Sequence, residues 1–251
     1  MVRSTSEEDR YDRMRRISWM DVDRFSRLKC LVVGAGALGN EVLKCMILAG
    51  FRDLTVVDMD RVEISNLSRC VFFRECDCGL IKSHVLAERA NRQSPNMNVK
   101  GINSKIQEID DWDYDLILGC LDNISARLHT NSHAIYHGIP YVDGGTDGMR
   151  GKVQTVLPGG PCLNCAINGS HVKVLNSRFS CTGSANAPPL LPAEITTTSI
   201  VAAMQVREAE KIASGKEDLC IRNITFYDGV RGTMDTVSLD MDEACPNYRW
   251  D

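Results

Sequence analysis

A glycine-rich turn between an apolar run and an amphipathic helix is the feature that most restricts the fold of this chain. The apolar run LKCLVVGAG leads into glycines spaced as Gly34-x-Gly36-x-x-Gly39. The segment that follows, ALGNEVLKCMILAG, has apolar residues at helical spacing and ends at Gly50, a typical helix stop. A second apolar run, LTVVDMD, begins at Leu54. This order of strand, glycine turn, helix and strand predicts a βαβ unit with parallel strands.

The alternation of strands and helices continues to about residue 145. Helical patterns in IKSHVLAERANRQ and ISARLHTNSHAIYHG alternate with the apolar runs YDLILGCLD and IPYVDGG. Further on, RGKVQTVLPG and residues 221–239 resemble antiparallel strands, with a long helix ending at Gly215 between them. We therefore predict an α/β fold, a Rossmann-like, doubly wound, mostly parallel sheet with an antiparallel C-terminal portion. Residues 1–28 are predicted to form a charged arm, and residues 29–251 a single domain.

The composition indicates an ordinary globular protein in a reducing compartment. A formal net charge of −4 over 251 residues gives no basis for nucleic acid as the main partner. No apolar run reaches the length of a membrane span, and the charged first twenty residues lack the apolar core of a secretion signal. Eleven cysteines in such a chain predict thiols or metal ligands rather than disulfides. We expect a cytoplasmic protein that binds neither nucleic acid nor membranes.

The residues after the second apolar run favour ATP over NAD. Asp58 ends that run, at the position where a carboxylate grips a ribose hydroxyl, and both nucleotides fit this feature. The segment DMDRVEISNLSR then brings amide and cationic groups, and Lys82 follows in GLIKSH. A triphosphate needs such groups and a divalent cation, whereas a dinucleotide does not. Asp122, at the end of an apolar run in CLDNISAR, is a candidate Mg²⁺ ligand.

Together these motifs resemble one family. The ordered set GxGxxG, D-x-D, SNLxR, K, D-N-x-x-x-R and V-D-G-G is similar to the ThiF/MoeB family and to the adenylation domains of compact ubiquitin-like-protein activating enzymes. The resemblance implies MgATP-dependent adenylation of the C-terminal glycine of a ubiquitin-like protein, carried out by a single adenylation domain over residues 29–251. It assigns the nucleotide contacts to Gly34, Gly36, Gly39, Asp58, Asp60, Ser65, Asn66, Arg69, Lys82 and Asp122.

The same resemblance implies a homodimer. RYDRMRR is similar to the family's N-terminal RYxRQ, whose second arginine reaches the nucleotide of the partner subunit. That arginine corresponds to Arg13, although Met14 stands where the family has glutamine. Arg13 is thus expected to act across a dimer, with a solvated surface charge as the alternative.

Two groups of cysteines are candidate functional residues. Cys162 and Cys165 form a C-x-x-C pair, which is half of a tetrahedral zinc site. The family supplies a second pair near the C-terminus, and here Cys245 is present while Tyr248 takes the place of its partner. Three interpretations stay open: a three-cysteine zinc site completed by water or another donor such as Cys220, a site that has lost zinc, or a change at Tyr248 peculiar to this sequence.

Cys181 is the expected acyl acceptor. It stands in RFSCTGSANAPPLLPAEITTTS, a loop that the resemblance places across the substrate tail, and its thiolate would hold the activated protein as a thioester. A conjugating enzyme would then be a further partner. An ordinary loop cysteine is the alternative.

Three other functions compete with this prediction. A sulfur-carrier adenylyltransferase shares the first step and differs in the acyl acceptor. An NAD-dependent oxidoreductase would leave Arg69, Lys82 and Asp122 unexplained. A non-catalytic scaffold subunit would not need the nearly complete set of ATP-binding residues. Separately, His129 and two histidines at four-residue intervals after it could form a metal-binding face, although a packed or exposed helix stripe is the commoner cause of such spacing.

Overall fold

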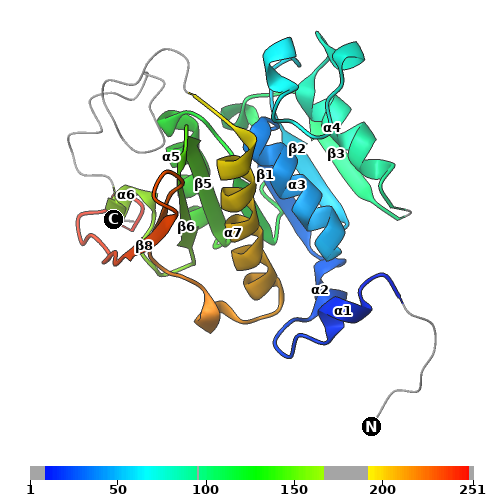
Figure 1. Ribbon diagram of the computed structural model, residues 1–251. Coiled ribbons are helices and arrows are strands. Elements are labelled where there is room, and N and C mark those ends of the chain that lie inside the picture. The colour runs from blue at the N-terminus through cyan, green and yellow to red at the C-terminus, as the bar shows by residue number, and fades with distance from the viewer. Residues whose placement is uncertain (1–8, 95, 167–191, 249–251) are drawn as a thin grey trace.

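The computed structural model describes residues 9–94, 96–166 and 192–248, and within them one eight-stranded sheet organises the molecule (Figure 1). The strand order is β3-β2-β1-β4-β5-β6-β7-β8. The first five strands in chain order pair in parallel and the last three join antiparallel. The strands are β1 (Lys29–Val33), β2 (Asp53–Val57), β3 (Asn98–Ile102), β4 (Leu116–Gly119), β5 (Tyr141–Asp147), β6 (Arg150–Val156), β7 (Ile224–Asp228) and β8 (Thr233–Val237).

Helices cover both faces of the parallel part of this sheet. The α-helices are α1 (Asp12–Arg15), α2 (Val22–Phe25), α3 (Ala37–Ala49), α4 (Lys82–Asn91), α5 (Ile124–Tyr136), α6 (Leu163–Ala166) and α7 (Ile195–Ala213). Short 3₁₀ turns are η1 (Ile64–Asn66), η2 (Glu75–Asp77), η3 (Ile106–Glu108) and η5 (Glu217–Leu219). The α3, α4 and α7 helices share one buried apolar core, and α5 and α6 share a second core. The doubly wound α/β prediction with an antiparallel C-terminal portion is confirmed.

The order of the strands creates the edge at which a ligand can bind. β1 lies between β2 and β4, so the chain leaves β1 toward one side of the sheet and returns on the other. In open α/β sheets the crevice outside the carboxyl ends of the strands at this reversal is the usual ligand site. Successive positions of β1 are buried on both faces, as the continuous run Cys30 to Val33 requires.

The N-terminal segment packs against the main core. Tyr11 and Phe25 are buried in the same core as α3 and α7, and Phe25 stacks on Phe51 with ring centroids 4.8 Å apart. Figure 1 shows α1 and α2 at the ends of α3 and α7. The boundary expected at residue 28 is therefore a change in chain pattern rather than a break in packing.

The glycine turn brings backbone against backbone at the start of α3. Gly34 has a φ of +104°, and a β-carbon there would lie 2.5 Å from the carbonyl oxygen of Cys120. A β-carbon on Gly39 would lie 1.9 Å from the carbonyl oxygen of Gly34. Around Gly36 a β-carbon would meet nothing within 4 Å. The absence of a side chain at Gly39 therefore permits α3 to begin directly on the turn.

This contact predicts a reversed effect of alanine inside a helix. Alanine normally stabilises an exposed helix relative to glycine by about 1 kcal/mol. Gly39→Ala forces the turn and helix apart instead, so we expect its free energy of unfolding to fall by about 1–3 kcal/mol. Gly36→Ala is the control and should stay close to wild type. Urea denaturation of both variants measures the difference, and equal stability of the two would contradict the assigned contact.

Candidate functional site

A cleft of about 260 Å³ opens at the carboxyl ends of β1, β2 and β4, where the strand order reverses. Eight of the residues predicted to bind nucleotide line it: Gly34, Gly36, Asp58, Asp60, Asn66, Arg69, Lys82 and Asp122. The residues come from four separate segments of the chain. Tertiary structure therefore gathers most of the predicted set at one place.

Asp58 joins the glycine turn to the end of β2. Its carboxylate accepts hydrogen bonds from the backbone N–H of Ala35 at 2.7 Å and of Asp60 at 2.8 Å. Burial raises the pKa of Asp58 above its ordinary value, despite these two hydrogen bonds and the nearby charge of Lys82. Each carboxylate oxygen keeps a lone pair for a further donor. The side chain is thus held rigidly with capacity for a ligand hydroxyl.

Two cations face the cleft from neighbouring segments. Lys82, at the start of α4, forms an ion pair with Asp60 at 3.1 Å, and its side chain is only 11% exposed. Arg69 donates from Nη1 to the backbone carbonyl of Ser65 at 2.5 Å. Ser65 therefore acts on the site through its carbonyl, by holding Arg69, and it does not line the cleft itself.

The N-terminus of α3 and the buried amide of Asn66 complete this wall. α3 begins at Ala37, directly after the glycine turn, so its unpaired N–H groups lie beside the cleft. Helix N-termini of this kind favour phosphate. Asn66 is buried, and its side-chain oxygen accepts from the backbone N–H of Glu63, which fixes η1. The wall combines amides and cations, the groups that stabilise polyanions.

A second, narrower hollow of about 90 Å³ continues from this cleft across Asp58 and Asp122. Lys105 and Asn123 line it, and sequence reasoning missed both. The signal for Lys105 was its place just after β3, at the same edge of the sheet. Asn123 caps α5 by accepting from the N–H of Ala126 at 2.8 Å. Thr146, Cys70 and Cys120 also line the main cleft.

Besides Ser65, two of the described residues predicted for this site lie outside the cleft. Gly39 packs against the turn from within α3. Arg13 is exposed in α1, whose neighbour Tyr11 contacts Gly50 at the far end of α3. The 13 residues of α3 span about 20 Å, so Arg13 and the cleft lie at opposite ends of this helix. Cys181 lies outside the described residues.

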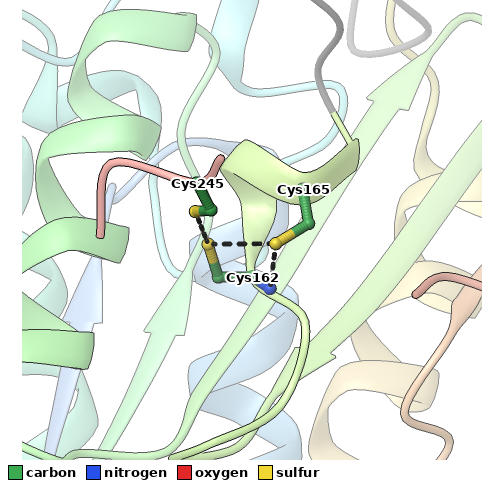
Figure 2. Close-up of side chains that lie close together, drawn as sticks. All are labelled: Cys162, Cys165 and Cys245. Atoms are coloured by element: carbon green, nitrogen blue, oxygen red, sulfur yellow. Dashed lines mark hydrogen bonds between the residues drawn. The ribbon is translucent and has the colours of Figure 1, made fainter. Parts of the chain in front are cut away.

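Three sulfur atoms meet between α6 and the C-terminal segment (Figure 2). Sγ of Cys162 is 3.9 Å from that of Cys165 and 3.6 Å from that of Cys245. A zinc–sulfur bond of about 2.3 Å in tetrahedral geometry places neighbouring sulfurs about 3.8 Å apart. The spacing of the cluster therefore fits three ligands of one zinc ion.

Among the described residues, the group of possible metal ligands at this cluster holds three cysteines and no fourth. The Tyr248 hydroxyl donates to the carbonyl of Gly160, so its proton is engaged away from the sulfurs. Cys220 belongs to the core on the opposite face of the sheet from Cys162 and Cys245. The interpretation that Cys220 supplies a donor is therefore wrong.

Polar neighbours prepare one of these thiols for deprotonation. Burial opposes ionisation of Cys162, but hydrogen bonds from Asn247, Asn131 and Cys165 outweigh it and lower the pKa of the Cys162 thiol. Burial raises the pKa of Cys245 to about 12.

The histidine stripe of α5 is a packing feature in the described residues. His133 stacks on Trp112 with ring centroids 4.3 Å apart and an interplanar angle of 11°. His129 and His137 lie on either side, 6.0 and 6.2 Å from the same ring. Within the described ranges, the cluster suited to a metal consists of cysteines and includes none of these histidines.

No helix in the described part of the chain is long and apolar enough to cross a bilayer.

Relatives with curated descriptions include subunits of activating enzymes. The NEDD8-activating enzyme E1 catalytic subunit of Arabidopsis thaliana is 39% identical over 157 residues, covering 56% of this chain and 35% of the relative. SUMO-activating enzyme subunit 2 of Dictyostelium discoideum is 32% identical over 149 residues, covering 57% and 22%. The chain thus spans well under half of the length of these relatives.

Solved structures share the fold over nearly the whole chain. The crystal structure of E. coli MccB with ATP has a TM-score of 0.79 at 19% identity, covering 96% of this chain and 74% of MccB. MccB with AMPCPP and MccA gives the same TM-score. The sequence pattern of the ThiF family matches residues 10–247. With that match, the eight-stranded sheet and the motifs gathered at its cleft, the chain belongs to the ThiF family.

Proposed function

We propose that this chain activates a ubiquitin-like protein by adenylating its C-terminal glycine with MgATP. The observation that carries the proposal is the convergence of the glycine turn, Asp58, Arg69, Lys82 and Asp122 on one cleft. Relatives named for NEDD8 and SUMO support a ubiquitin-like substrate. The proposal places the protein in a reducing, cytoplasmic setting, in which its free cysteines persist.

The residues present fit a bound nucleotide triphosphate. Gly36, where a β-carbon would meet nothing within 4 Å, and the start of α3 leave room for phosphate against the backbone, with Arg69 and Lys82 to balance its charge. Asp58 would accept from the ribose, and the narrow hollow at Lys105 would take the base. An NAD-dependent reaction would leave the two cations without a role.

Magnesium is the metal that this edge of the sheet would hold. Asp122 is exposed in the cleft after β4 and offers a carboxylate ligand. When bound, Mg²⁺ would neutralise phosphate oxygens as pyrophosphate leaves.

The chemistry requires positioning more than a side-chain base. A glycine carboxylate oxygen attacks the α-phosphorus, the bond from that phosphorus to the bridging oxygen breaks, and pyrophosphate departs. Both reactants are anionic, so charge neutralisation by Arg69 and Lys82 and alignment by the turn supply the catalysis. In a second step the Cys181 thiolate would attack the acyl carbon and displace AMP, leaving a thioester. A sulfur-carrier enzyme would use a sulfur donor as acceptor instead.

The proposed reaction is tested with purified protein, MgATP and a panel of ubiquitin-like proteins that end in Gly-Gly. We expect pyrophosphate exchange with at least one panel member and a reductant-labile adduct by intact mass. Cys181→Ala should lose the adduct and keep the exchange. Cys76→Ala removes an exposed cysteine elsewhere and is the control. Exchange without an adduct would support the sulfur-carrier alternative, and no exchange with any member would contradict the proposal.

We also propose that the protein works as a homodimer in which Arg13 serves the partner's cleft. The exposed position of Arg13, at the far end of α3 from its own cleft, supports this arrangement. A dimer that places two such chains antiparallel would bring each arm to the partner's nucleotide.

Mixed variants test the action of Arg13 across subunits. Arg13→Ala and Asp122→Ala are each expected to be inactive alone. After exchange of subunits, half of the dimers are mixed and each restores one site, so the mixture should reach about one quarter of wild-type exchange activity. Activity of the mixture no higher than that of either variant would show that Arg13 does not act in trans.

We propose that the cluster of Cys162, Cys165 and Cys245 binds zinc. Three sulfurs at tetrahedral spacing support it, and water or another donor would fill the fourth position. Such an ion would tie the C-terminal segment to α6, adding to the hydrogen bonds of Asn247 with Cys162 and Asn164.

The zinc content of the protein and its Tm together test whether zinc stabilises this part of the fold. Wild-type protein should contain one zinc ion per chain, and Cys162→Ser should lose it. A change of about 1 kcal/mol in the free energy of unfolding shifts the Tm of a domain of this size by about 2–4 °C. Because zinc binding stabilises the folded protein, we expect the Tm of Cys162→Ser to fall by more than about 4 °C. Cys76→Ser should keep both zinc and Tm. Wild-type protein that binds no zinc when it is supplied would rule out the site.

A further inference from the structure

We infer that Arg127 is a positioning residue for the Asp122 loop, the β4–α5 loop that contains Asp122. Arg127 holds this loop in the geometry needed for Asp122 to bind Mg²⁺. The inference rests on the proposed MgATP site and adds to it a residue that does not line the cleft. Arg127 is on α5 and only 3% exposed. A buried guanidinium needs partners for its donors, and the identity of these partners indicates its role.

Arg127 connects two neighbouring strand ends. Its Nε donates to the carbonyl of Leu121 at 3.0 Å, in the loop after β4. Its Nη1 and Nη2 donate to the carboxylate of Asp143 at 3.1 Å and the carbonyl of Gly144 at 2.6 Å, both in β5. One planar side chain thus fixes the distance between the β4–α5 loop and β5.

Both connected segments continue into the cleft. Leu121 lies beside Asp122, and both line the cleft. Gly144 is followed by Gly145 and Thr146, which also line it. The carboxylate of Asp122 is exposed, and the one hydrogen bond that it accepts from the described residues is long, 3.5 Å, from Asn123. The backbone of the loop therefore has the main part in placing Asp122, and Arg127 holds that backbone.

The other end of the connection is itself rigid. Asp143 is fully buried and also accepts from the hydroxyl of Tyr141 at 2.8 Å. The Tyr141 hydroxyl lies against Gly119, where a β-carbon would come within 2.3 Å of it. Asp143 is thus packed against β4, and Arg127 transmits this fixed position to the loop.

Replacing Arg127 by lysine keeps the positive charge but removes the planar, fork-shaped set of hydrogen-bond donors. Arg127→Lys can keep an ion pair with Asp143, but a single ammonium cannot reach three acceptors in two segments at once. We expect the loop to loosen and the Mg²⁺ concentration for half-maximal ATP binding to rise about tenfold, as for other misplaced ligands. ATP binding in EDTA should be unchanged. The measurement is titration of ATP binding at a series of Mg²⁺ concentrations.

A double variant distinguishes positioning of Asp122 from a general loss of structure. If Arg127 acts through Asp122, then Arg127→Lys has no further effect on the Mg²⁺ requirement of an Asp122→Asn protein. Arg89→Lys is the matched control, because Arg89 forms a partly buried ion pair with Asp77 at 2.8 Å, away from the cleft. That variant should lower the Tm and leave the Mg²⁺ requirement at the wild-type value.

Each outcome decides the inference. An unchanged Mg²⁺ requirement in Arg127→Lys, or additive effects in the double variant, would overturn it. If Arg127→Lys does not fold, Tyr141→Phe is measured in its place. We expect the Mg²⁺ concentration for half-maximal ATP binding of Tyr141→Phe to rise about two- to threefold, and no rise would overturn the inference. Wild-type protein without Mg²⁺-dependent ATP binding would instead refute the proposed function, and the role of Arg127 with it.

Discussion

The parallel pairing of β1 with β2 on one side and β4 on the other is the constraint on which the rest of the molecule depends. It directs the ends of three strands to one edge and leaves a crevice there. The glycine turn, the Asp58 carboxylate and the Asp122 loop each follow one of these strands. Their closeness is thus a consequence of strand order, because no two of them are neighbours along the chain.

Close packing at this edge converts strand order into a defined site. Backbone contacts at Gly34 and Gly39 seat α3 against the turn, so that its N-terminus faces the cleft. Asp58 locks the turn to β2, and Arg127 locks the β4–α5 loop to β5. The cleft is preorganised by contacts behind it, as expected of a site whose task is to align two anions.

The antiparallel part of the sheet leads to the cysteine cluster, away from the nucleotide cleft. β6 returns from β5 and leads to α6, where Cys162 and Cys165 meet Cys245 from the C-terminal segment. This cluster lies on the face covered by α5, whereas Cys220 lies in the core of α7. Position relative to the sheet, which spacing along the chain does not encode, decides which cysteines act together.

The sequence by itself determined the α/β class, the glycine turn and most of the residues lining the cleft, because period and motif order are local properties of a chain. It did not reveal Lys105 and Asn123 as lining residues, the separation of Arg13 from its own cleft, or the exclusion of Cys220. Nor did it assign a role to Arg127, although the motif D-N-x-x-x-R contained it. Only the tertiary structure decided these points, because they depend on which strand ends and helix faces are brought together across the sheet.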